Sequence, residues 1–268
     1  MSEQRCLEVA KSAAAAAAEI IRHYYRAGVT VHEKADATPV TRADVESEQA
    51  IRGIIEQAFP DHGFFGEETG QAALDADYLW LVDPIDGTKA FVRGYPFFST
   101  QIALMHRGEL VLGVSSAPEF GELVWAQRGA GAWEGSTRLQ VSAVDRIEEC
   151  ALSAGNLKSL ASGPGWGAYG GLVSRVNRIR GYGDFYHYHL LARGGIDAVI
   201  ESDVNILDIA ALAVIVTEAG GRFTDLEGQP VGLATTSVLA SNRPLYPQLR
   251  EALAGGLTAG PPEDSGLR

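Results

Sequence analysis

The residues best suited to chemistry form one short acidic segment, Asp83-Pro84-Ile85-Asp86-Gly87-Thr88. It follows the apolar run Tyr78-Leu79-Trp80-Leu81-Val82, which predicts a buried strand that ends where the carboxylates begin. Proline fixes its own φ angle, so both carboxylates and the Ile85 carbonyl can point into one small volume. Oxygen atoms that converge in this way favour a hard cation. Gly87 would allow close approach of a ligand, and Thr88 would add a hydroxyl beside it.

Two other interpretations of this segment need to be weighed. Asp-Pro and Asp-Gly pairs also form ordinary turns that bind nothing, and this alternative stays open for the segment alone. A calcium loop of the EF-hand type requires a Glu at its twelfth position, where this chain has Gly94. We therefore exclude the calcium loop.

Glu67 repeats the arrangement of an apolar strand that runs into acidic residues. The strand would be Phe64-Phe65, followed by Gly66 and the pair Glu67-Glu68. Such a pair is most often a solvated charge pair, but its place at a strand end could add a carboxylate to a nearby metal site. Both interpretations remain open from the sequence alone.

Asp44 and Asp208 lie where helices are predicted to begin. Asp44 follows Thr41 in a variant of the capping box, and Asp208 follows Asn205 in the first turn of a strongly apolar helix. The helix macrodipole stabilises a carboxylate at such a position without any metal. A structural role therefore stands beside a chemical one for each of them.

Composition limits the classes of partner. The formal net charge of −12 argues against a nucleic-acid surface and, without a metal, against phosphorylated ligands. The only cysteines, Cys6 and Cys150, indicate a reduced compartment, where both would be inert packing residues. The run from Ala13 to Ala18 is flanked by Glu8 and Glu19, so it is not a signal-peptide core. No apolar stretch reaches membrane-spanning length, and we expect a cytoplasmic protein.

The remaining elements follow from periodicity and from Gly and Pro residues. We expect a subdomain boundary near residues 145–150, with strand and helix alternating after it. Gly181-Tyr182-Gly183-Asp184 should lead into a helix, and the strand 196–200 should end at Glu201. Helices are predicted at 3–26, 41–59, 185–192, 209–219 and 244–253. Strands are predicted at 29–31, 97–106, 109–116, 223–226 and 237–241, with hairpins over 122–141, exposed loops at 33–39 (with Lys34 and Asp36) and 159–171, and a frayed tail from Gly255.

Three spaced motifs together resemble the inositol monophosphatase family in order and spacing, over roughly residues 5–254. Within that family, the segments from Asp86 to Phe91 and from Gly94 to Pro96 look most like the histidinol-phosphatase branch, as does Gly183-Asp184 through Glu201. The three motifs are Gly66-Glu67-Glu68, Asp83-Pro84-Ile85-Asp86-Gly87-Thr88, and Leu207-Asp208-Ile209-Ala210-Ala211 followed by Glu218-Ala219-Gly220-Gly221.

The resemblance implies an α/β fold, a layered αβαβα sandwich of the inositol monophosphatase and fructose-1,6-bisphosphatase type. It implies subdomains at 1–146 and 147–254, a tail at 255–268, and a homodimer whose ligand is a small phosphorylated metabolite. The implied reaction is hydrolysis of a phosphate monoester with two or three Mg²⁺ ions per site. By motif match the metal ligands would be Glu67, Asp83, Ile85, Asp86 and Asp208, the catalytic residues Glu67, Thr88 and Asp44, and the substrate-binding residues Asp86, Gly87, Thr88, Asp184, Glu201 and Asp208.

Substrate choice depends on departures from the family pattern. Many inositol-cleaving members have Asn where this chain has Ala90, which disfavours inositol, whereas Leu207 replaces an aromatic residue without removing a metal ligand. Asp184 and Glu201 could pair with the ammonium and imidazole of L-histidinol phosphate, which we expect as the substrate. The alternatives are an inositol-1-monophosphatase, a 3′-phosphoadenosine 5′-phosphate phosphatase, and a catalytically silent regulator that binds metal or phosphate on the same fold.

Overall fold

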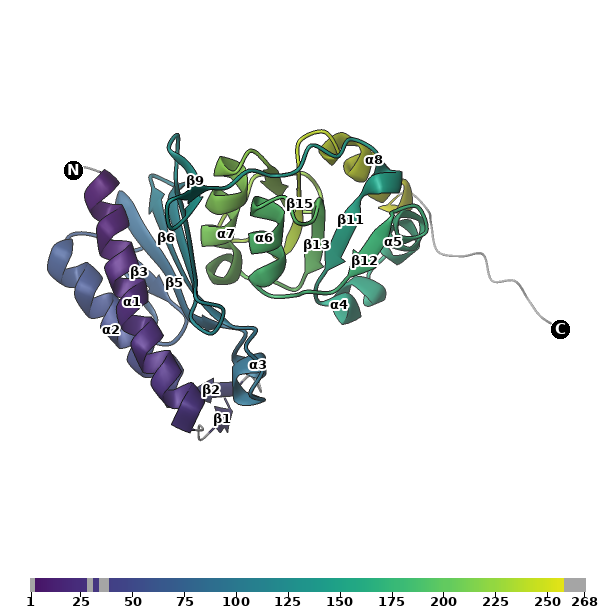
Figure 1. The fold of residues 1–268 in the computed structure, drawn as a ribbon. Helices are drawn as coiled ribbons and strands as arrows, with labels where there is room; N and C mark the ends of the chain where they lie inside the picture. The colour runs from purple at the N-terminus through teal and green to yellow at the C-terminus, as the bar shows by residue number, and fades with distance from the viewer. Residues whose placement is uncertain (1–2, 28–30, 34–38, 258–268) are drawn as a thin grey trace.

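Two mixed β-sheets form the frame of the structure, a computed structural model that describes residues 3–27, 31–33 and 39–257 (Figure 1). The large sheet has the strand order β10-β9-β8-β7-β6-β5-β3-β4. Its strands are β3 (Gly63–Gly66), β4 (Gln71–Ala72), β5 (Tyr78–Asp86), β6 (Ser99–His106), β7 (Glu109–Ala117), β8 (Glu122–Gln127), β9 (Gly131–Glu134) and β10 (Thr137–Arg138).

The small sheet has the order β12-β11-β13-β15-β14, and a short ribbon pairs β1 with β2. Its strands β11, β12 and β13 are parallel, whereas β15 runs antiparallel to β13 and β14. The bounds are β1 (Val31–Glu33), β2 (Pro39–Thr41), β11 (Ala151–Ala154), β12 (Arg178–Arg180), β13 (Ala198–Ser202), β14 (Arg222–Thr224) and β15 (Ser237–Ser241).

Helices cover both sheets and fill the space between them, in five layers (Figure 1). Two helices pack on the outer face of the large sheet, two lie between the sheets, and three cover the outer face of the small sheet. This arrangement confirms the predicted αβαβα sandwich. In the same order, the helices are α1 (Glu3–Ala27) and α2 (Arg42–Ala58), α6 (Tyr186–Ala192) and α7 (Ile206–Glu218), and α4 (Leu157–Ser162), α5 (Trp166–Val173) and α8 (Tyr246–Leu257).

Strand β5 connects two apolar cores because its side chains alternate between the faces of the sheet. Trp80 and Val82 pack toward α1 and α2, whereas Leu79 and Leu81 pack toward α6 and α7. The prediction that the strand ends at the first carboxylate is wrong. The ladder continues to Asp86, with an irregularity in register after Asp83, and this bulge redirects the acidic side chains.

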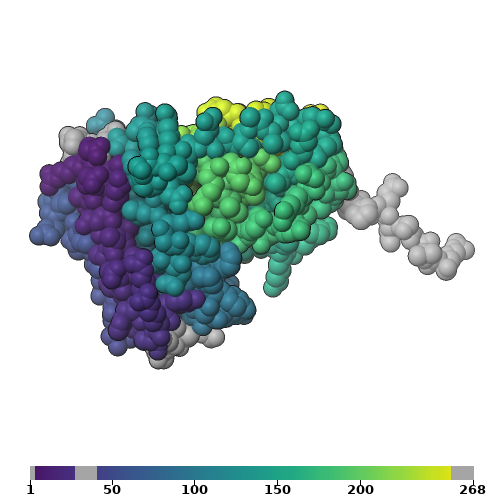
Figure 2. Space-filling model, viewed as in Figure 1, coloured from purple at the N-terminus to yellow at the C-terminus, as the bar shows by residue number. Residues whose placement is uncertain are grey.

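Alanines form the middle of the buried face of α1, between the buried side chains of Leu7 and Ile21. Ala10, Ala13, Ala14 and Ala17 are fully buried, whereas Ile20, which was predicted on the inner face, is only half-buried. Small side chains let this helix lie close to its neighbours, and Figure 2 shows it as a purple ridge along the surface. The predicted cap, at position 28, lies outside the described residues.

The segment 159–171 was predicted to be an exposed loop, and this is wrong. It contains most of α4 and of α5, because Leu160 and Tyr169 belong to the apolar core of the small sheet and α5 packs against α8. Gly167 and Gly170 lie on the exposed side, where they weaken the sequence signal without weakening that contact. The early strand predicted at 29–31 is described from Val31 to Glu33, since positions 29 and 30 lie outside the described residues, and α8 runs to Leu257. The loop positions 34–38, with Lys34 and Asp36, and the tail from 258 onward lie outside the described residues.

The two sheets meet through shared packing. The chain leaves the large sheet at the end of β10 and enters the small one at β11, while side chains of α7 belong to a core that includes residues of both sheets. A subdomain boundary between residues 146 and 147 stays a prediction.

Both cysteines are buried in apolar cores, as expected for inert packing residues. Cys6 lies in the core under α1, and Cys150 lies in the core of the small sheet. Desolvation, with a contribution from the charge of Asp197, raises the pKa of Cys150 to about 12, so its thiol stays protonated at neutral pH. None of the helices in the described ranges combines the length and hydropathy needed to cross a bilayer.

Candidate active site

Three aspartates from two distant segments converge at one point. Asp83 and Asp86 come from the end of β5, and Asp208 comes from the first turn of α7. One carboxylate oxygen from each lies within 4.8 Å of the others. Asp83 and Asp86 are only 2% and 9% exposed, so their charges face one another with little water between them.

The electrostatics of this cluster are those of a cation site. Desolvation and the charges of neighbouring carboxylates raise the pKa of Asp83 and of Asp86 well above the usual range. Desolvation also raises the pKa of Asp208 to about 6, although hydrogen bonds from Asn205 oppose the shift. A divalent cation would offset this repulsion, and carboxylate oxygens are the ligands that Mg²⁺ prefers. The donor set therefore fits the metal that the sequence led us to expect.

Asp44 and Asp208 each combine a helix cap with a place in the site. Asp44 Oδ2 accepts hydrogen bonds from the backbone N–H and the hydroxyl of Thr41, at 2.8 and 2.6 Å. Asp208 accepts from the backbone and side-chain nitrogens of Asn205, at 2.9 and 2.8 Å. Asp44 Oδ1 also lies 3.3 Å from Thr88 Oγ1, so the cap and the predicted contact to Thr88 coexist.

Thr88 lies where β5 turns into the short helix α3 (Thr88–Val92). Its hydroxyl can donate either to Asp44 Oδ1 or to the Ile85 carbonyl, which is 3.0 Å away. Gly87 before it has a φ of +91°, and a Cβ there would lie 2.5 Å from the Phe97 carbonyl oxygen. This turn therefore requires glycine.

Glu67 lies beside the aspartate cluster but is not part of the close group. Its side chain is exposed, and one of its carboxylate interactions is a hydrogen bond with Asp83, which adds to the raised pKa of Asp83 after desolvation and charge. The structure thus places four predicted metal carboxylates in one region, with three of them in contact range of a single ion.

Sequence reasoning missed Glu48, which holds the loop that carries Glu67. The Glu48 carboxylate is fully buried and accepts hydrogen bonds from the backbone N–H groups of Glu68 and Thr69, at 2.8 and 2.5 Å. Its spacing from Asp44 on α2 puts both on one helix face, which was an available signal. Gly66 lies so close that a Cβ there would be 2.3 Å from Glu48 Oε1.

Asp184 and Glu201 lie on the side of the site away from β5. Both line a small pocket of about 40 Å³ that Asp86 and Asp208 line as well. Asp184 has a φ of +42°, and desolvation together with the charge of Glu201 raises its pKa. Wider hollows elsewhere on the surface contain none of these carboxylates.

Glu201 is held by the protein itself. Its Oε2 accepts a hydrogen bond from the Tyr188 hydroxyl at 2.7 Å and lies 3.1 Å from His187 Nε2. A Cβ at Gly155 would come within 2.0 Å of its Oε1, so glycine is needed there too. Glu201 therefore supports the pocket wall as well as lining it.

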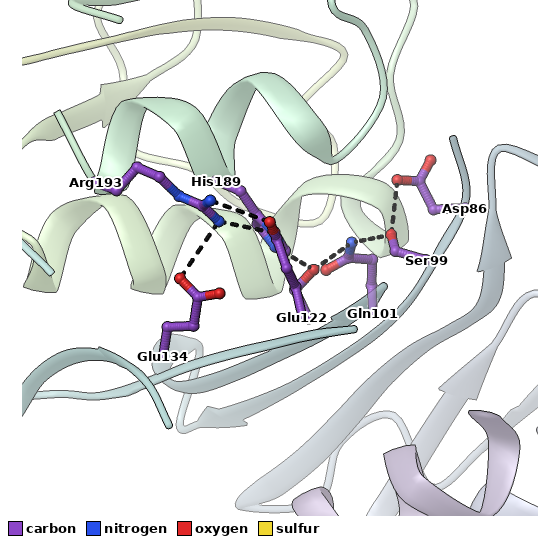
Figure 3. A network of polar contacts seen from close by, with 8 residues as sticks. Asp86, Ser99, Gln101, Glu122, Glu134, His189 and Arg193 are labelled. Atoms are coloured by element: carbon purple, nitrogen blue, oxygen red, sulfur yellow. Dashed lines mark hydrogen bonds and ion pairs between the residues drawn. The ribbon is translucent and has the colours of Figure 1, made fainter. Parts of the chain in front are cut away.

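Ser99 is the other residue that sequence reasoning missed. It lies opposite Asp86 on β6, and its hydroxyl donates to Asp86 Oδ2 at 3.4 Å (Figure 3). The partner strand gives no local signal for such a contact, because the pairing register is set by the whole sheet.

Comparisons with known proteins agree with this geometry. The model of the inositol monophosphatase family matches residues 2–258. The chain is 39% identical over 237 residues to a histidinol-phosphatase of Mycobacterium tuberculosis, which covers 84% of this chain and 88% of that protein. It is 35% identical over 232 residues to an inositol-1-monophosphatase of Caulobacter vibrioides, covering 83% and 90% respectively. The structure of an inositol monophosphatase from Anabaena superposes with a TM-score of 0.84 at 28% identity, over 98% of this chain and 99% of that one.

Proposed function

This chain belongs to the inositol monophosphatase family of metal-dependent phosphatases, and on that premise we propose that it hydrolyses L-histidinol phosphate with Mg²⁺. The observation that carries the proposal is a pocket lined both by carboxylates of the candidate metal cluster and by two further carboxylates. Asp86 and Asp208 belong to the candidate metal cluster, and Asp184 and Glu201 line the same pocket, close enough for their charges to raise the pKa of Asp86. Histidinol phosphate has a phosphate for the metal side and an ammonium and imidazole for the acidic side, whereas inositol has only hydroxyls there.

Asp83, Asp86 and Asp208 would hold the metal, with Glu67 and the Ile85 carbonyl as further ligands in a site for two or three ions. Bound Mg²⁺ supplies Lewis-acid stabilisation of the phosphoryl group and lowers the pKa of a coordinated water. The raised pKa values of the three aspartates support this assignment, because such carboxylates gain most from a cation.

The protein's own groups would orient the reactants. When the Thr88 hydroxyl donates to Asp44, its oxygen lone pairs are available to align an attacking water, and Glu67 can accept the proton of that water. Gly87 and Thr88 would contact the phosphate oxygens. No covalent phosphoenzyme is needed, since water is the nucleophile.

Inositol-1-phosphate is the second candidate substrate, since the Caulobacter relative carries that activity in its name. One experiment distinguishes the two candidate substrates. We expect Mg²⁺-dependent phosphate release to show the highest kcat/KM for L-histidinol phosphate in a panel that includes inositol-1-phosphate and 3′-phosphoadenosine 5′-phosphate. A preference for either of the other two would overturn the substrate assignment and leave the phosphatase assignment intact.

The variant D184N tests whether Asp184 recognises the cationic part of the substrate. If Asp184 pairs with a cationic leaving group, D184N should lower kcat/KM for histidinol phosphate by a factor equivalent to about 1–3 kcal/mol of transition-state stabilisation. The kcat/KM for glycerol phosphate should change little. D203N is the matched control, because Asp203 is also exposed with a positive φ but does not line the pocket. Equal losses on both substrates would mean that Asp184 only maintains the shape of the pocket.

We also propose a cytoplasmic location and a homodimer. The two cysteines of the sequence are both free and buried, which supports a reducing compartment. Light scattering coupled to size exclusion would measure the mass of the assembly, and a monomer would contradict the dimer.

A further inference from the structure

A chain of hydrogen bonds runs from Asp86 through the interior of the large sheet to helix α6 (Figure 3). Ser99 connects Asp86 to Gln101, whose Nε2 lies 2.7 Å from Ser99 Oγ and 3.0 Å from Ser115 Oγ. Ser115 Oγ then lies 2.8 Å from His189 Nε2. Ser99, Gln101, Ser115 and His189 are all fully buried. Apolar packing does not explain why these polar side chains are buried.

The far end of the chain is an ion pair. His189 Nδ1 lies 2.8 Å from Glu122 Oε2, and Arg193 donates to both oxygens of Glu122 at 3.0 and 2.8 Å. Arg193 also lies 3.5 Å from Glu134. Desolvation raises the pKa of Glu122, but hydrogen bonds from His189 and Arg193 outweigh it and lower the pKa to about 2. Desolvation lowers the pKa of His189, so a neutral imidazole faces an ionised carboxylate.

The number of hydrogens fixes the direction of the chain. The two N–H groups of Gln101 Nε2 serve the two serines, so the Ser99 hydroxyl can donate its own hydrogen to Asp86. Ionised Glu122 can only accept a hydrogen bond from Nδ1, so the neutral imidazole leaves Nε2 to accept the hydrogen of Ser115. The imidazole proton is then on Nδ1, where it is donated to Glu122.

A proton on His189 Nε2 instead of Nδ1 would reverse the direction of these hydrogen bonds. A proton on His189 Nε2 would occupy the Ser115 oxygen, and the Ser115 hydroxyl would need a new acceptor. Gln101 Oε1 is buried and has no hydrogen-bond partner among the described residues. Rotation of the amide would place this oxygen between the serines and draw the Ser99 hydroxyl away from Asp86.

We infer that His189 is a positioning residue for Asp86 and acts on it through Ser115, Gln101 and Ser99. The inference rests on the proposed metal site and extends it to a residue that contacts neither metal nor substrate. Outer-shell partners of metal ligands commonly contribute about 10–100-fold to metal affinity or activity. A partner that acts through three intervening side chains should contribute less, about threefold to tenfold.

Mn²⁺ binding measured by calorimetry tests the inference without turnover. H189F keeps a ring against Phe185 but removes the acceptor for Ser115, and we expect Mn²⁺ to bind it about threefold to tenfold more weakly than wild type. H189Q offers an amide oxygen near the position of Nε2, so it should recover most of the affinity. In steady-state assays the same variants should shift the Mg²⁺ concentration for half-maximal rate and leave the KM for substrate nearly unchanged.

H62F is the matched control, because His62 also packs against aromatic rings, and its hydrogen bond, accepted by Nδ1 from Trp80 Nε1 at 3.0 Å, does not involve the aspartates. It should change the melting temperature without changing Mn²⁺ affinity. If folded H189F binds Mn²⁺ as tightly as wild type, the positioning role is overturned while the metal site stands. If wild type itself binds no Mn²⁺, the proposed function fails with it.

Two further measurements keep the inference testable if H189F does not fold. S115A removes only the intermediate hydroxyl, and its Mn²⁺ affinity should fall in the same direction as that of H189F. In ¹⁵N-histidine spectra at neutral pH, the His189 signals, identified by their loss in H189Q, should show a protonated Nδ1 and an unprotonated Nε2. A proton on Nε2 would contradict the proposed direction of the chain.

Discussion

Asp44 and Asp208 show how single residues are prepared for the site. Each is the third residue of its helix and is anchored to the residue at the helix cap by two hydrogen bonds. A carboxylate held in this way loses little further freedom when it takes up a second contact. The sequence left two interpretations open for each aspartate, a helix cap and a functional residue. The structure shows that these two interpretations are compatible.

Thr88 gives the sharpest prediction at this scale. T88A removes the hydroxyl that bridges to Asp44, so kcat should fall by about a hundredfold or more, while Mn²⁺ affinity stays nearly constant. T224A is a suitable control, because the Thr224 hydroxyl bonds to Asp225 and Tyr246 on the small sheet. An unchanged kcat in T88A would leave Asp44 as a helix cap only.

The sequence predicted residues of this site when their signal was local. Asp83 and Asp86 lie in one motif, and Asp208 follows its cap residue within three positions. Ser99 could not be predicted as a site residue, because its contact with Asp86 depends on the register between β5 and β6. The spacing of Glu48 from Asp44 put it on the same helix face, but its partners are backbone N–H groups, which carry no side-chain signature.

At the scale of elements, α1 is a helix whose buried face consists of alanines over its middle turns. A14L would add volume to a fully buried position and should lower the free energy of unfolding by about 1–3 kcal/mol. A15L makes the same change on the exposed neighbour and should have little effect. Urea unfolding of the two variants measures the difference. Equal stability would show that the helix can move outward at no cost.

Helix α6 is attached to the large sheet by the Glu122 ion pair, which gives a pH dependence. The folded pKa of Glu122, about 2, lies below its unfolded value of about 4.3. Its contribution to stability is therefore complete above the unfolded value and is lost as pH falls toward 2. The stability difference between wild type and E122Q should be largest near pH 6 and shrink toward pH 3.

Urea unfolding at several pH values measures this difference. E56Q serves as the control, since Glu56 forms an exposed ion pair with Arg52 on α2, of a kind that contributes little at any pH. A wild-type advantage over E122Q that stays constant down to pH 3 would contradict the assignment.

Elements with strong periodicity were predictable, whereas those stabilised by a few distant contacts were not. α7 and β15 follow from uninterrupted apolar patterns. α4 is short, and α5 contains three glycines and packs against α8, which lies more than 70 residues further along the chain. The end of β5 was misplaced because a bulge continues the ladder past Pro84.

For the whole molecule, α7 belongs to a core shared by both sheets, so the two halves should unfold together. We expect one calorimetric transition whose midpoint rises with Mg²⁺. A ligand at a hundred times its Kd stabilises the folded state by about 2.7 kcal/mol. EDTA should remove this gain, and D86N should not show it. Two separate transitions, or a midpoint indifferent to Mg²⁺, would contradict this view.

The position of α7 also limits how such enzymes can be recombined. A chimera that exchanged the chain after β10 for that of a relative would import a new α6 and α7, and with them the facing half of the core against β5, β6 and β7. Gly113 on β7 lies so close to α7 that a Cβ there would be 2.3 Å from the Ala211 carbonyl oxygen. Transplanted substrate specificity would therefore require Gly113 and its neighbours on the acceptor sheet to match the incoming helix.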